Sequence, residues 1–468
     1  MSIETRKYTA VVVGAGPGGY PCAIRLAQLG VKTLCIEKEY WGGVCLNVGC
    51  IPSKALITAA KKYKELDKLA EMGIEINTDA NLNVEKLQAW KSKVVGKLTG
   101  GIRTLLDKNG SDRMFGNARF ISPGVIEVDT AEGTVRVECE HLIIATGSRP
   151  IQIPGFSYAD ERIMDSTKAL DLDHIPKRTV VIGGGYIGME LGMMLQKVGS
   201  EVIIVEAQDQ ILPGFDPEVI KFFKRKLKKL KVTVHLNSLA QGWEEGEDGA
   251  VVKIKTADGI KEIAADRVLV TVGRLPNSKG LEALGLEMDR RGHIIVDKQQ
   301  KTNVPGVYAV GDVATGVMLA HKATHEGEIC AEVIAGHAAF NDARTVPAVV
   351  FTDPEIAVAG LMENEAKDKG YEIKVGKVPF AAIGRALTAN AAEGFIKVIL
   401  DAADDRILGI TVLGPAASDL ISEAALAIEM DAEALDMGLT IHPHPTLGEG
   451  MMEAAKAALG QAVHILNR

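Results

Sequence analysis

Two cysteines, Cys45 and Cys50, lie five positions apart in residues 41–54, whose sequence is WGGVCLNVGCIPSK. A regular helix would hold their Cα atoms about 8.6 Å apart, beyond the roughly 7 Å that a disulfide spans. The two sulfurs can therefore bond only if the chain leaves the helix between them, and Gly49 gives the backbone that freedom. The pair could be a structural disulfide, part of a metal site, two buried apolar side chains, or a redox couple.

The rest of the composition weighs against the first two interpretations. Six cysteines in 468 residues are too few for a disulfide framework. Closing so short a loop gains only about 2 kcal/mol. A zinc site would need a second pair of ligands, and the clustered histidines, His442 and His444, stand far along the chain. The cysteines alone leave inert buried thiols and a redox pair equally open. The remaining cysteines stand singly and are expected to be small buried side chains: Cys22, Cys35, Cys139 and Cys330.

The C-terminal segment HPHPTLGEG, residues 442–450, offers a possible base for thiol chemistry. A neutral imidazole can take a proton from a thiol, and a carboxylate five residues on could hold the ring in the right tautomer. Taken by itself, a His-Pro-His-Pro loop is more simply interpreted as a rigid turn with surface histidines.

The elements that would position such a pair come from a pattern that occurs twice, from Tyr8 and again from Lys177. Each copy predicts a buried strand (residues 10–13 and 180–182), a glycine turn, an amphipathic helix that ends near Gly30 or Gly199, and a second strand that ends on an acid. The first copy holds Gly14, Gly16, Gly19 and Glu37; the second holds Gly183, Gly185, Gly188 and Glu206, each 169 residues after its counterpart.

This spacing is typical of dinucleotide binding. The first glycine permits the turn, the second lets the backbone approach a pyrophosphate, and the third brings helix and strand together. The acid accepts hydrogen bonds from a ribose, so the chain is expected to bind two dinucleotides. After Glu206 come Ala207, Gln208 and Asp209, with no cation for a 2′-phosphate, which favours NAD over NADP.

The remaining sequence predicts an α/β fold with a C-terminal α+β block. Residues 113–149 and 232–274 alternate as strands and end in the similar segments IIATGSRP and VLVTVGRLP. Residues 302–315 form a strand that ends on Gly311 and Asp312, and ligands of open α/β sheets bind at such strand ends. From about Val346, two strands within 394–414, a helix near 418–430 and a helix from about Glu449 indicate an antiparallel domain.

Composition excludes several partners. A net charge of −8 argues against nucleic acid, and the basic residues 221–231 are predicted to form a solvated amphipathic helix. No apolar run is expected to cross a membrane. The glycine motif begins so early that no signal or transit peptide is expected, so the predicted location is the cytoplasm.

With these motifs in place, the sequence resembles the flavoprotein disulfide reductases over essentially its whole length. The most specific segments are GGVCLNVGCIPSK (42–54), ATGSRP (145–150), TNVPGVYAVGDV (302–313), FTDPEIAVAG (351–360) and HPHPTLGE (442–449). The resemblance implies an FAD-binding domain in two parts, 1–148 and 277–346, an NAD-binding domain at 149–276, and a dimerisation domain at 347–468.

The resemblance also implies residue roles. Cys45 is similar to the interchange thiol that meets the substrate and Cys50 to the charge-transfer thiol at the flavin, whereas His444 would be the base, oriented by Glu449 and contributed by the other subunit of a homodimer. His442 falls outside the matched role. FAD would be held by Gly14, Gly16, Gly19, Glu37, Lys54, Gly116, Gly147, Asp312 and Ala320, with Lys54 paired to Glu190. NAD would be held by Gly183, Gly185, Gly188, Glu190, Glu206 and Gly273, and no metal is implied.

Within this family, the resemblance implies the oxidation of protein-bound dihydrolipoyl groups to lipoyl with reduction of NAD. The implied partners are lipoyl domains and the core acyltransferase of 2-oxo acid dehydrogenase complexes, or a glycine-cleavage lipoyl protein. Another NAD(P)H-dependent disulfide reductase is the alternative. Glu206 speaks against the NADP-preferring glutathione and trypanothione reductases, and the C-terminus lacks the extra cysteine pair of mercuric reductase. From another class, a non-catalytic nucleotide-binding subunit is also considered. Val44 and Gly448 depart from the commonest family pattern but carry no chemistry.

Overall fold

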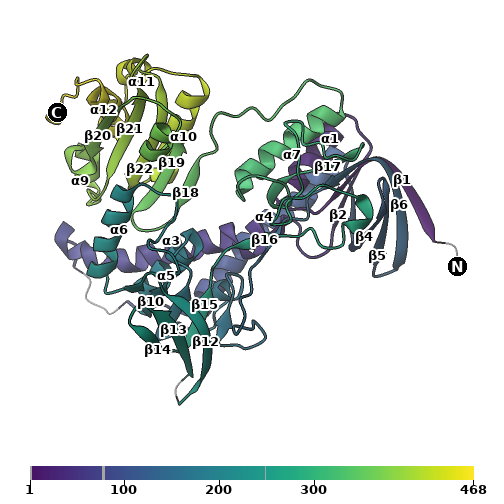
Figure 1. The fold of residues 1–468 in the computed structure, drawn as a ribbon, viewed down its shortest axis with the longest axis horizontal. Helices are drawn as coiled ribbons and strands as arrows, with labels where there is room; N and C mark the ends of the chain where they lie inside the picture. The colour runs from purple at the N-terminus through teal and green to yellow at the C-terminus, as the bar shows by residue number, and fades with distance from the viewer. Residues whose placement is uncertain (1–2, 76–79, 248, 468) are drawn as a thin grey trace. The chain divides into compact units, whose positions relative to one another are not determined.

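The computed structural model describes residues 3–75, 80–247 and 249–467. The chain divides into two compact units. Unit 1 comprises residues 1–175 and 269–342, and unit 2 comprises residues 176–268 and 343–468. Figure 1 shows the elements of both.

The central sheet of unit 1 has strands in the order β3-β2-β1-β6-β5-β4, with β17 also paired to β6. Four strands run parallel to their neighbours: β1 (Glu4–Val13), β2 (Thr33–Glu37), β3 (Asp112–Phe115) and β17 (Val307–Ala309). An antiparallel meander is formed by β4 (Asn117–Ser122), β5 (Val125–Thr130) and β6 (Gly133–Ile144). The carboxyl ends of the parallel strands therefore meet at one edge, where the residues with predicted roles gather.

Both faces of this sheet are buried, which explains the unbroken apolar run of the first strand. Val11 and Val13 contribute to one core, and Ala10 and Val12 contribute to the other. Successive side chains of a strand point to opposite faces, so a strand covered on both sides reads as continuously apolar. On the Ala10 and Val12 face lie three helices: α1 (Gly19–Gln28), α4 (Val84–Asn109) and α7 (Ala320–Ile334).

Two further helices of unit 1, α2 (Gly43–Val48) and α3 (Cys50–Glu65), follow the first glycine repeat. Among the described residues, Gly43–Met72 is the one stretch with the length and mean hydropathy (1.3) of a candidate membrane span. It is not one straight helix, because Gly49, at φ −141° and ψ −112°, separates α2 from α3. Ala55, Leu56 and Ile57 of α3 are buried, so its apolar side chains have a protein core in which to pack.

Unit 2 contains the second glycine repeat. Its strands β9 (Arg178–Ile182), β10 (Glu201–Val205) and β11 (Thr233–His235) are parallel and are followed in that sheet by β15 (Arg267–Val270). Helix α5 (Tyr186–Lys197) joins β9 to β10, and α6 (Pro217–Lys229) is the predicted amphipathic helix, with Val219, Phe223 and Leu227 buried. Strands β12 (Leu239–Gly246), β13 (Gly249–Thr256) and β14 (Gly259–Ala265) form an antiparallel meander.

The C-terminal part of unit 2 contains a separate five-stranded antiparallel sheet. Its strands are β18 (Ala348–Val350), β19 (Glu355–Gly360), β22 (Ile407–Gly414), β21 (Phe395–Asp401) and β20 (Ile373–Pro379), in that order. The helices α10 (Ala417–Glu429), α11 (Ala434–Leu439) and α12 (Glu449–Ala458) pack with these strands around one apolar core. In Figure 1 this domain is the green-to-yellow part of the ribbon.

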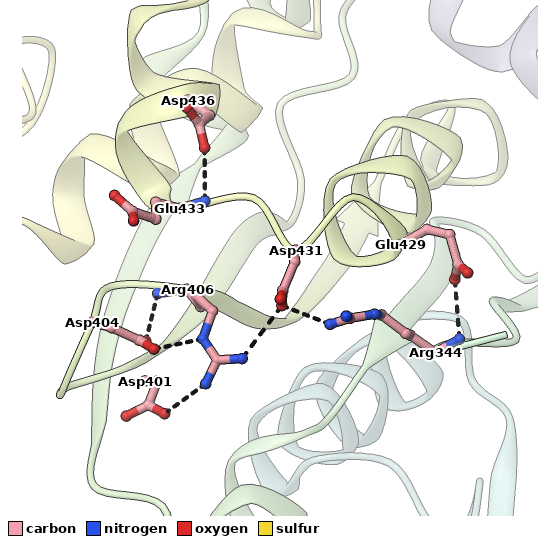
Figure 2. A network of polar contacts seen from close by, with 8 residues as sticks. All are labelled: Arg344, Asp401, Asp404, Arg406, Glu429, Asp431, Glu433 and Asp436. Atoms are coloured by element: carbon pink, nitrogen blue, oxygen red, sulfur yellow. Dashed lines mark hydrogen bonds and ion pairs between the residues drawn. The ribbon is translucent and has the colours of Figure 1, made fainter. Parts of the chain in front are cut away.

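An exposed network of charges fixes one corner of this C-terminal domain (Figure 2). Asp431 Oδ1 lies 2.6 Å from an Arg344 nitrogen and 3.3 Å from an Arg406 nitrogen, and Arg406 also binds Asp404 at 2.6 Å. The contacts join the turn between β21 and β22 to the loop between α10 and α11. Since all these side chains are solvent-exposed, the network orients the corner more than it stabilises the fold.

The fold class predicted from the sequence is confirmed, with two Rossmann-like sheets and a C-terminal antiparallel domain. The two similar strand-exit segments pair with each other: β7 (Ser148–Pro150) lies antiparallel to β16 (Arg274–Pro276). Unit 2 holds strands of three separate sheets, so a compact unit can contain more than one domain. The predicted boundaries after residues 148, 276 and 346 stay predictions.

Candidate active site

The first glycine turn is closed by contacts that only glycine allows. Gly14 has φ +106°, and a Cβ there would lie 2.2 Å from the Ala145 carbonyl oxygen. Gly19 is buried at the start of α1. At Gly16, by contrast, a Cβ would meet no atom nearer than 3.9 Å. The second glycine of the motif thus faces open space of the kind that a pyrophosphate needs, which fits the nucleotide predicted there.

The second repeat reproduces this arrangement. Gly183 has φ +103°, Gly188 is buried in α5, and a Cβ at Gly185 would have no atom within 4 Å. A side chain at Gly185 would therefore fill space that the fold itself leaves empty. The residues present fit a second dinucleotide.

Both acids at the second-strand ends are held in the same way. Glu37 Oε2 accepts a 2.7 Å hydrogen bond from the Ala15 N–H, and Glu206 Oε2 accepts a 2.6 Å bond from the Gly184 N–H. In each repeat the donor is the residue after the first glycine. Both carboxylates are 8% exposed, so each is fixed at the carboxyl end of its strand, where a ribose would lie.

The cysteine pair stands at the break between two helices. Cys45 lies in α2 and Cys50 begins α3, and the non-helical backbone of Gly49 between them, at φ −141° and ψ −112°, supplies the departure from the helix. Both cysteines are half-buried thiols, and the Cys50 side chain contacts that of Cys45. Helix α2 is set against the first glycine turn, because a Cβ at Gly43 would lie 2.5 Å from the Gly16 Cα.

The pair has a distinct electrostatic environment. The neighbouring Cys50 thiol, and then burial, raise the pKa of the Cys45 thiol well above its usual value, and the Lys54 ammonium acts in the opposite direction. Burial, and then the nearby Cys45, also raise the pKa of Tyr20 on α1. The environment of Cys45 therefore favours its protonated thiol, from which a base would remove the proton before the sulfur attacks.

Asp312 sits at the carboxyl end of β17, at the centre of a polar chain. Ser148 Oγ donates a 2.6 Å hydrogen bond to Asp312 Oδ2, and Arg274 Nε donates a 2.7 Å bond to Ser148 Oγ. Ser148 and Arg274 are the first residues of the paired strands β7 and β16. Asp312, predicted to help hold FAD, is thus oriented by two residues to which the sequence assigned no role.

A buried ion pair supports the same loop from behind. Glu326 Oε2 accepts a 2.8 Å hydrogen bond from the Gly311 N–H, next to Asp312, and Glu326 Oε1 lies 2.8 Å from Lys322 Nζ. Burial raises the pKa of Glu326, and the Lys322 ammonium opposes that shift. The spacing of Lys322 and Glu326, one helical turn apart in α7, was a signal in the sequence, but only the fold brings Glu326 to Gly311.

The remaining residues predicted to line the flavin lie around this edge of unit 1. The Gly116 N–H donates a 2.9 Å bond to the Glu37 carbonyl, so Gly116 lies beside the first acid. Gly147, at φ +70°, directly precedes Ser148, and Ala320 is the first residue of α7. Gly273, predicted for NAD, also belongs to unit 1, where its carbonyl accepts a bond from the Ile151 N–H.

In unit 2, α5 carries the other predicted contact. Glu190 is 4% exposed, and its Oε1 accepts a 2.8 Å bond from the Phe351 N–H. Seven residues on, Lys197 Nζ lies 2.9 Å from Asp353. The segment FTDPE, singled out in the sequence, therefore anchors α5. The predicted pairing of Lys54 with Glu190 joins residues of different units and stays a prediction.

The C-terminal histidine and acid meet as predicted. His444 Nδ1 lies 2.8 Å from Glu449 Oε1, and Glu449 Oε2 accepts a 2.9 Å bond from the Thr446 N–H. Burial acts to raise the pKa of Glu449, but His444 and the Thr446 N–H outweigh it and lower the pKa overall. A carboxylate at Nδ1 leaves Nε2 of the exposed His444 ring as the atom that can take a proton.

The cysteines that stand singly in the sequence were expected to be small buried side chains. Burial, and then the neighbouring Cys22 thiol, raise the pKa of the Cys330 thiol, so these two cysteines lie close together between α1 and α7. Both side chains are fully buried, as is Cys35, whereas Cys139 is only half-buried. Helices α1 and α7 are separated by almost the whole of unit 1 in sequence, so no local pattern could reveal the contact.

The chain matches the family model of the pyridine nucleotide-disulphide oxidoreductases over residues 8–327 and the model of that family's dimerisation domain over residues 346–455. It belongs to the pyridine nucleotide-disulphide oxidoreductase family. The matched regions include both glycine repeats, the cysteine pair and the His444–Glu449 pair.

The sequence relatives are similar over full length. The dihydrolipoyl dehydrogenase of Geobacillus stearothermophilus is 48% identical over 100% of this chain and 99% of its own. That of Bacillus subtilis (strain 168) is 49% identical over 97% of each chain.

Among solved structures, LpdA from Mycobacterium tuberculosis has a TM-score of 0.90 at 26% identity, over 96% of this chain and 99% of its own. The HOCl-induced flavoprotein disulfide reductase RclA from Escherichia coli has a TM-score of 0.86 at 27% identity, over 96% and 99%.

Proposed function

We propose that this protein catalyses the FAD-dependent oxidation of protein-bound dihydrolipoyl groups to lipoyl, with reduction of NAD. Full-length identity of 45–49% to dihydrolipoyl dehydrogenases is the observation that carries this proposal. The two neighbouring thiols at a helix break support it, because a dithiol that can close to a disulfide is what the reaction needs.

The thiol half-reaction starts from the oxidised Cys45–Cys50 pair. A dihydrolipoyl thiolate attacks the Cys45 sulfur, and the Cys45–Cys50 bond breaks to leave a thiolate on Cys50. The second lipoyl sulfur then displaces Cys45, which closes the lipoyl ring and leaves both cysteines reduced. Two electrons have passed to the cysteine pair, and the two dihydrolipoyl protons remain with Cys45 and the base.

The base in this scheme is His444. It takes a proton from the dihydrolipoyl thiol through Nε2, while Glu449 holds Nδ1 and stabilises the imidazolium. A match to the family's dimerisation domain over 346–455 supports a homodimer, and we propose that each His444 serves the cysteines of the other subunit. The raised pKa of Cys45 favours its protonated form once the cysteines are reduced, so a base at that sulfur is needed in the reverse direction.

The cofactor residues follow the two glycine repeats. We propose that Gly14, Gly16, Gly19, Glu37, Gly116, Gly147, Asp312, Ala320 and Lys54 hold FAD, and that Gly183, Gly185, Gly188, Glu190, Glu206 and Gly273 hold NAD. When bound, the flavin supplies a two-electron acceptor for the reduced cysteines and a hydride donor for NAD. The chain's own task is to fix the dithiol and the two nucleotides. Ser148 and Arg274 orient Asp312 for this purpose. Glu206 is followed by no cationic side chain that could bind a 2′-phosphate, which favours NAD.

The partners that we propose are lipoyl domains and the core acyltransferase of 2-oxo acid dehydrogenase complexes, or a glycine-cleavage lipoyl protein. The names of the relatives support a lipoyl substrate but do not distinguish these carriers. A cytoplasmic location also stays a prediction.

Steady-state turnover with free dihydrolipoamide tests the proposal. We expect NADH formation, much weaker turnover with NADP, and no activity with glutathione disulfide and NADPH. Cys50→Ser should lose dihydrolipoamide turnover and keep its flavin, whereas the matched control Cys139→Ser should behave as the unmodified protein. Full turnover by Cys50→Ser, or a preference for glutathione disulfide, would overturn the proposed function.

A further inference from the structure

His442, two residues before the proposed base, has no role in the scheme above, yet it is the more firmly held histidine of this loop. Its Nδ1 lies 2.8 Å from the Thr440 carbonyl oxygen, and its Nε2 lies 2.8 Å from Glu423 Oε1. The His442 side chain is 7% exposed, against 78% for His444. The ring is therefore fixed inside the domain while its neighbour projects from it.

Both partners of the His442 ring are acceptors. The Thr440 carbonyl and the Glu423 carboxylate accept hydrogen bonds only, so the ring can bond to either of them only as a donor. Thr440 directly follows α11, and Glu423 lies in α10. The ring thus ties the start of the His-Pro-His-Pro loop to two separate helices, and it cannot rotate without losing a bond.

The rest of the loop is closed around His442. Thr446 Oγ1 donates a 2.7 Å hydrogen bond to the Pro443 carbonyl, which joins the two ends of the turn that carries His444. A Cβ at Gly448 would lie 3.5 Å from His442 Cδ2, an ordinary packing distance, so the far end of the loop rests on the His442 ring. Among the described contacts, the His444 ring itself is bonded only to Glu449.

We propose that His442 is a positioning residue for the base: its bond to Glu423 fixes the loop 442–448, and through that loop the place of His444 Nε2. This inference rests on the proposed function, since it assumes that His444 takes the thiol proton. Displacing a reacting group by about 1 Å can cost about 100-fold in rate, so loss of the anchor should be visible in turnover.

The chain provides a matched control on the same helix as Glu449. Four residues on in α12, Glu453 Oε1 accepts from His464 Nδ1 at 2.9 Å, and the His464 side chain is 60% exposed. This second histidine–glutamate pair ties down the C-terminal tail and carries no part of the loop 442–448. His464→Gln therefore makes the same kind of chemical change away from the base.

Three variants at position 442 separate the two bonds. Glutamine places its amide nitrogen near the position of Nε2 and can keep the bond to Glu423. Asparagine places its amide nitrogen near Nδ1 and can keep only the bond to Thr440. Alanine keeps neither. If the bond to Glu423 positions the base, His442→Gln should keep most of the rate of reduction by dihydrolipoamide, and His442→Asn should lose it.

The test measures two half-reactions of the flavin-loaded dimer by stopped flow: reduction by dihydrolipoamide and reduction by NADH. We expect His442→Asn and His442→Ala to slow the dihydrolipoamide reaction at least about tenfold, and His442→Gln to stay within about threefold. The NADH reaction should stay within about twofold for all of them, and His464→Gln should be unaffected in both. Glu423→Ala removes the same hydrogen bond by changing the acceptor, so its dihydrolipoamide reaction should be slowed as much as that of His442→Asn. This variant replaces His442→Ala in the test if His442→Ala folds poorly.

Three results would overturn the inference. They are an unchanged dihydrolipoamide reaction in His442→Asn and Glu423→Ala, an equal loss of both half-reactions, or equal losses in His442→Asn and His464→Gln. His444→Gln distinguishes this failure from that of the proposed function. If His444→Gln keeps a normal dihydrolipoamide reaction, the proposed base itself is wrong; if it loses that reaction and His442→Asn does not, only the anchoring role fails.

Discussion

Replacing Gly185 by alanine should separate nucleotide binding from folding. Gly185 has φ −71° and ψ −178°, which alanine adopts without strain, and an added Cβ would meet no protein atom within 4 Å. Alanine restricts the unfolded chain by about 0.4–1 kcal/mol but is a poorer N-cap for α5 by a similar amount. The free energy of unfolding should therefore change by less than about 1 kcal/mol.

Nucleotide binding should respond very differently. The methyl group would occupy the space through which the backbone approaches the pyrophosphate, and one or more hydrogen bonds to a charged group would lengthen. Such bonds contribute about 1.5–3 kcal/mol, which corresponds to about a 10- to 150-fold weaker Kd for NADH. We expect a comparable rise in KM for NAD, with unchanged reduction by dihydrolipoamide.

The assay combines fluorescence titration with NADH, steady-state kinetics and thermal unfolding. Gly242→Ala in β12 is the matched control, since a Cβ there also meets no atom within 4 Å, in the same unit but away from the glycine turn. It should alter neither binding nor stability. An unchanged Kd for NADH in Gly185→Ala would refute the assignment of this turn to the pyrophosphate. A loss of several kcal/mol in stability would refute the structural reasoning behind it.

Two further predictions concern the C-terminal part of unit 2. Lys397 is almost fully buried and pairs with the buried Asp216, so Lys397→Met should lower the free energy of unfolding by about 3–5 kcal/mol in urea titrations. Lys374→Met, which removes an exposed ion pair, should lower it by less than about 1 kcal/mol. Equal effects of the two substitutions would contradict this prediction. Because the folded-state pKa of Glu449 is lowered, its ionised form stabilises the fold above the unfolded-state pKa of about 4.3 and loses that contribution as pH falls through the folded value. Glu449→Gln should therefore reduce the loss of stability between about pH 5 and pH 3 in thermal scans, and an unchanged acid dependence would contradict the cited shift.

The repeated elements could be predicted because their causes are local in sequence. A strand, a glycine turn, a helix and an acid follow one another within one repeat, and each has its own residue pattern. The structure adds what holds the acids: the N–H groups of Ala15 and Gly184, both within the turns already recognised. Likewise, Gly49 was identified as the residue that would allow the chain to leave the helix between the cysteines, and α2 and α3 are separated at Gly49.

The supporting residues could not be predicted because their partners are distant in sequence. Ser148, Arg274 and Asp312 form one polar chain only after β7 pairs with β16 at the end of the sheet. The contact of Cys22 with Cys330 depends on how α1 packs on α7. The residues around a buried cysteine in the sequence do not indicate which side chain it will contact in the fold. His442 was set aside because the family resemblance assigns no role to it, and only its two acceptors reveal how firmly it is held.

The central claim is that Cys45 and Cys50 form a reversible disulfide that exchanges electron pairs with a bound flavin. Anaerobic titration of the purified, flavin-loaded protein with dithionite counts those electrons directly. The unmodified protein should take up about two two-electron equivalents per flavin before it is fully reduced, and Cys50→Ser about one. Equal uptake by the two proteins would contradict the claim.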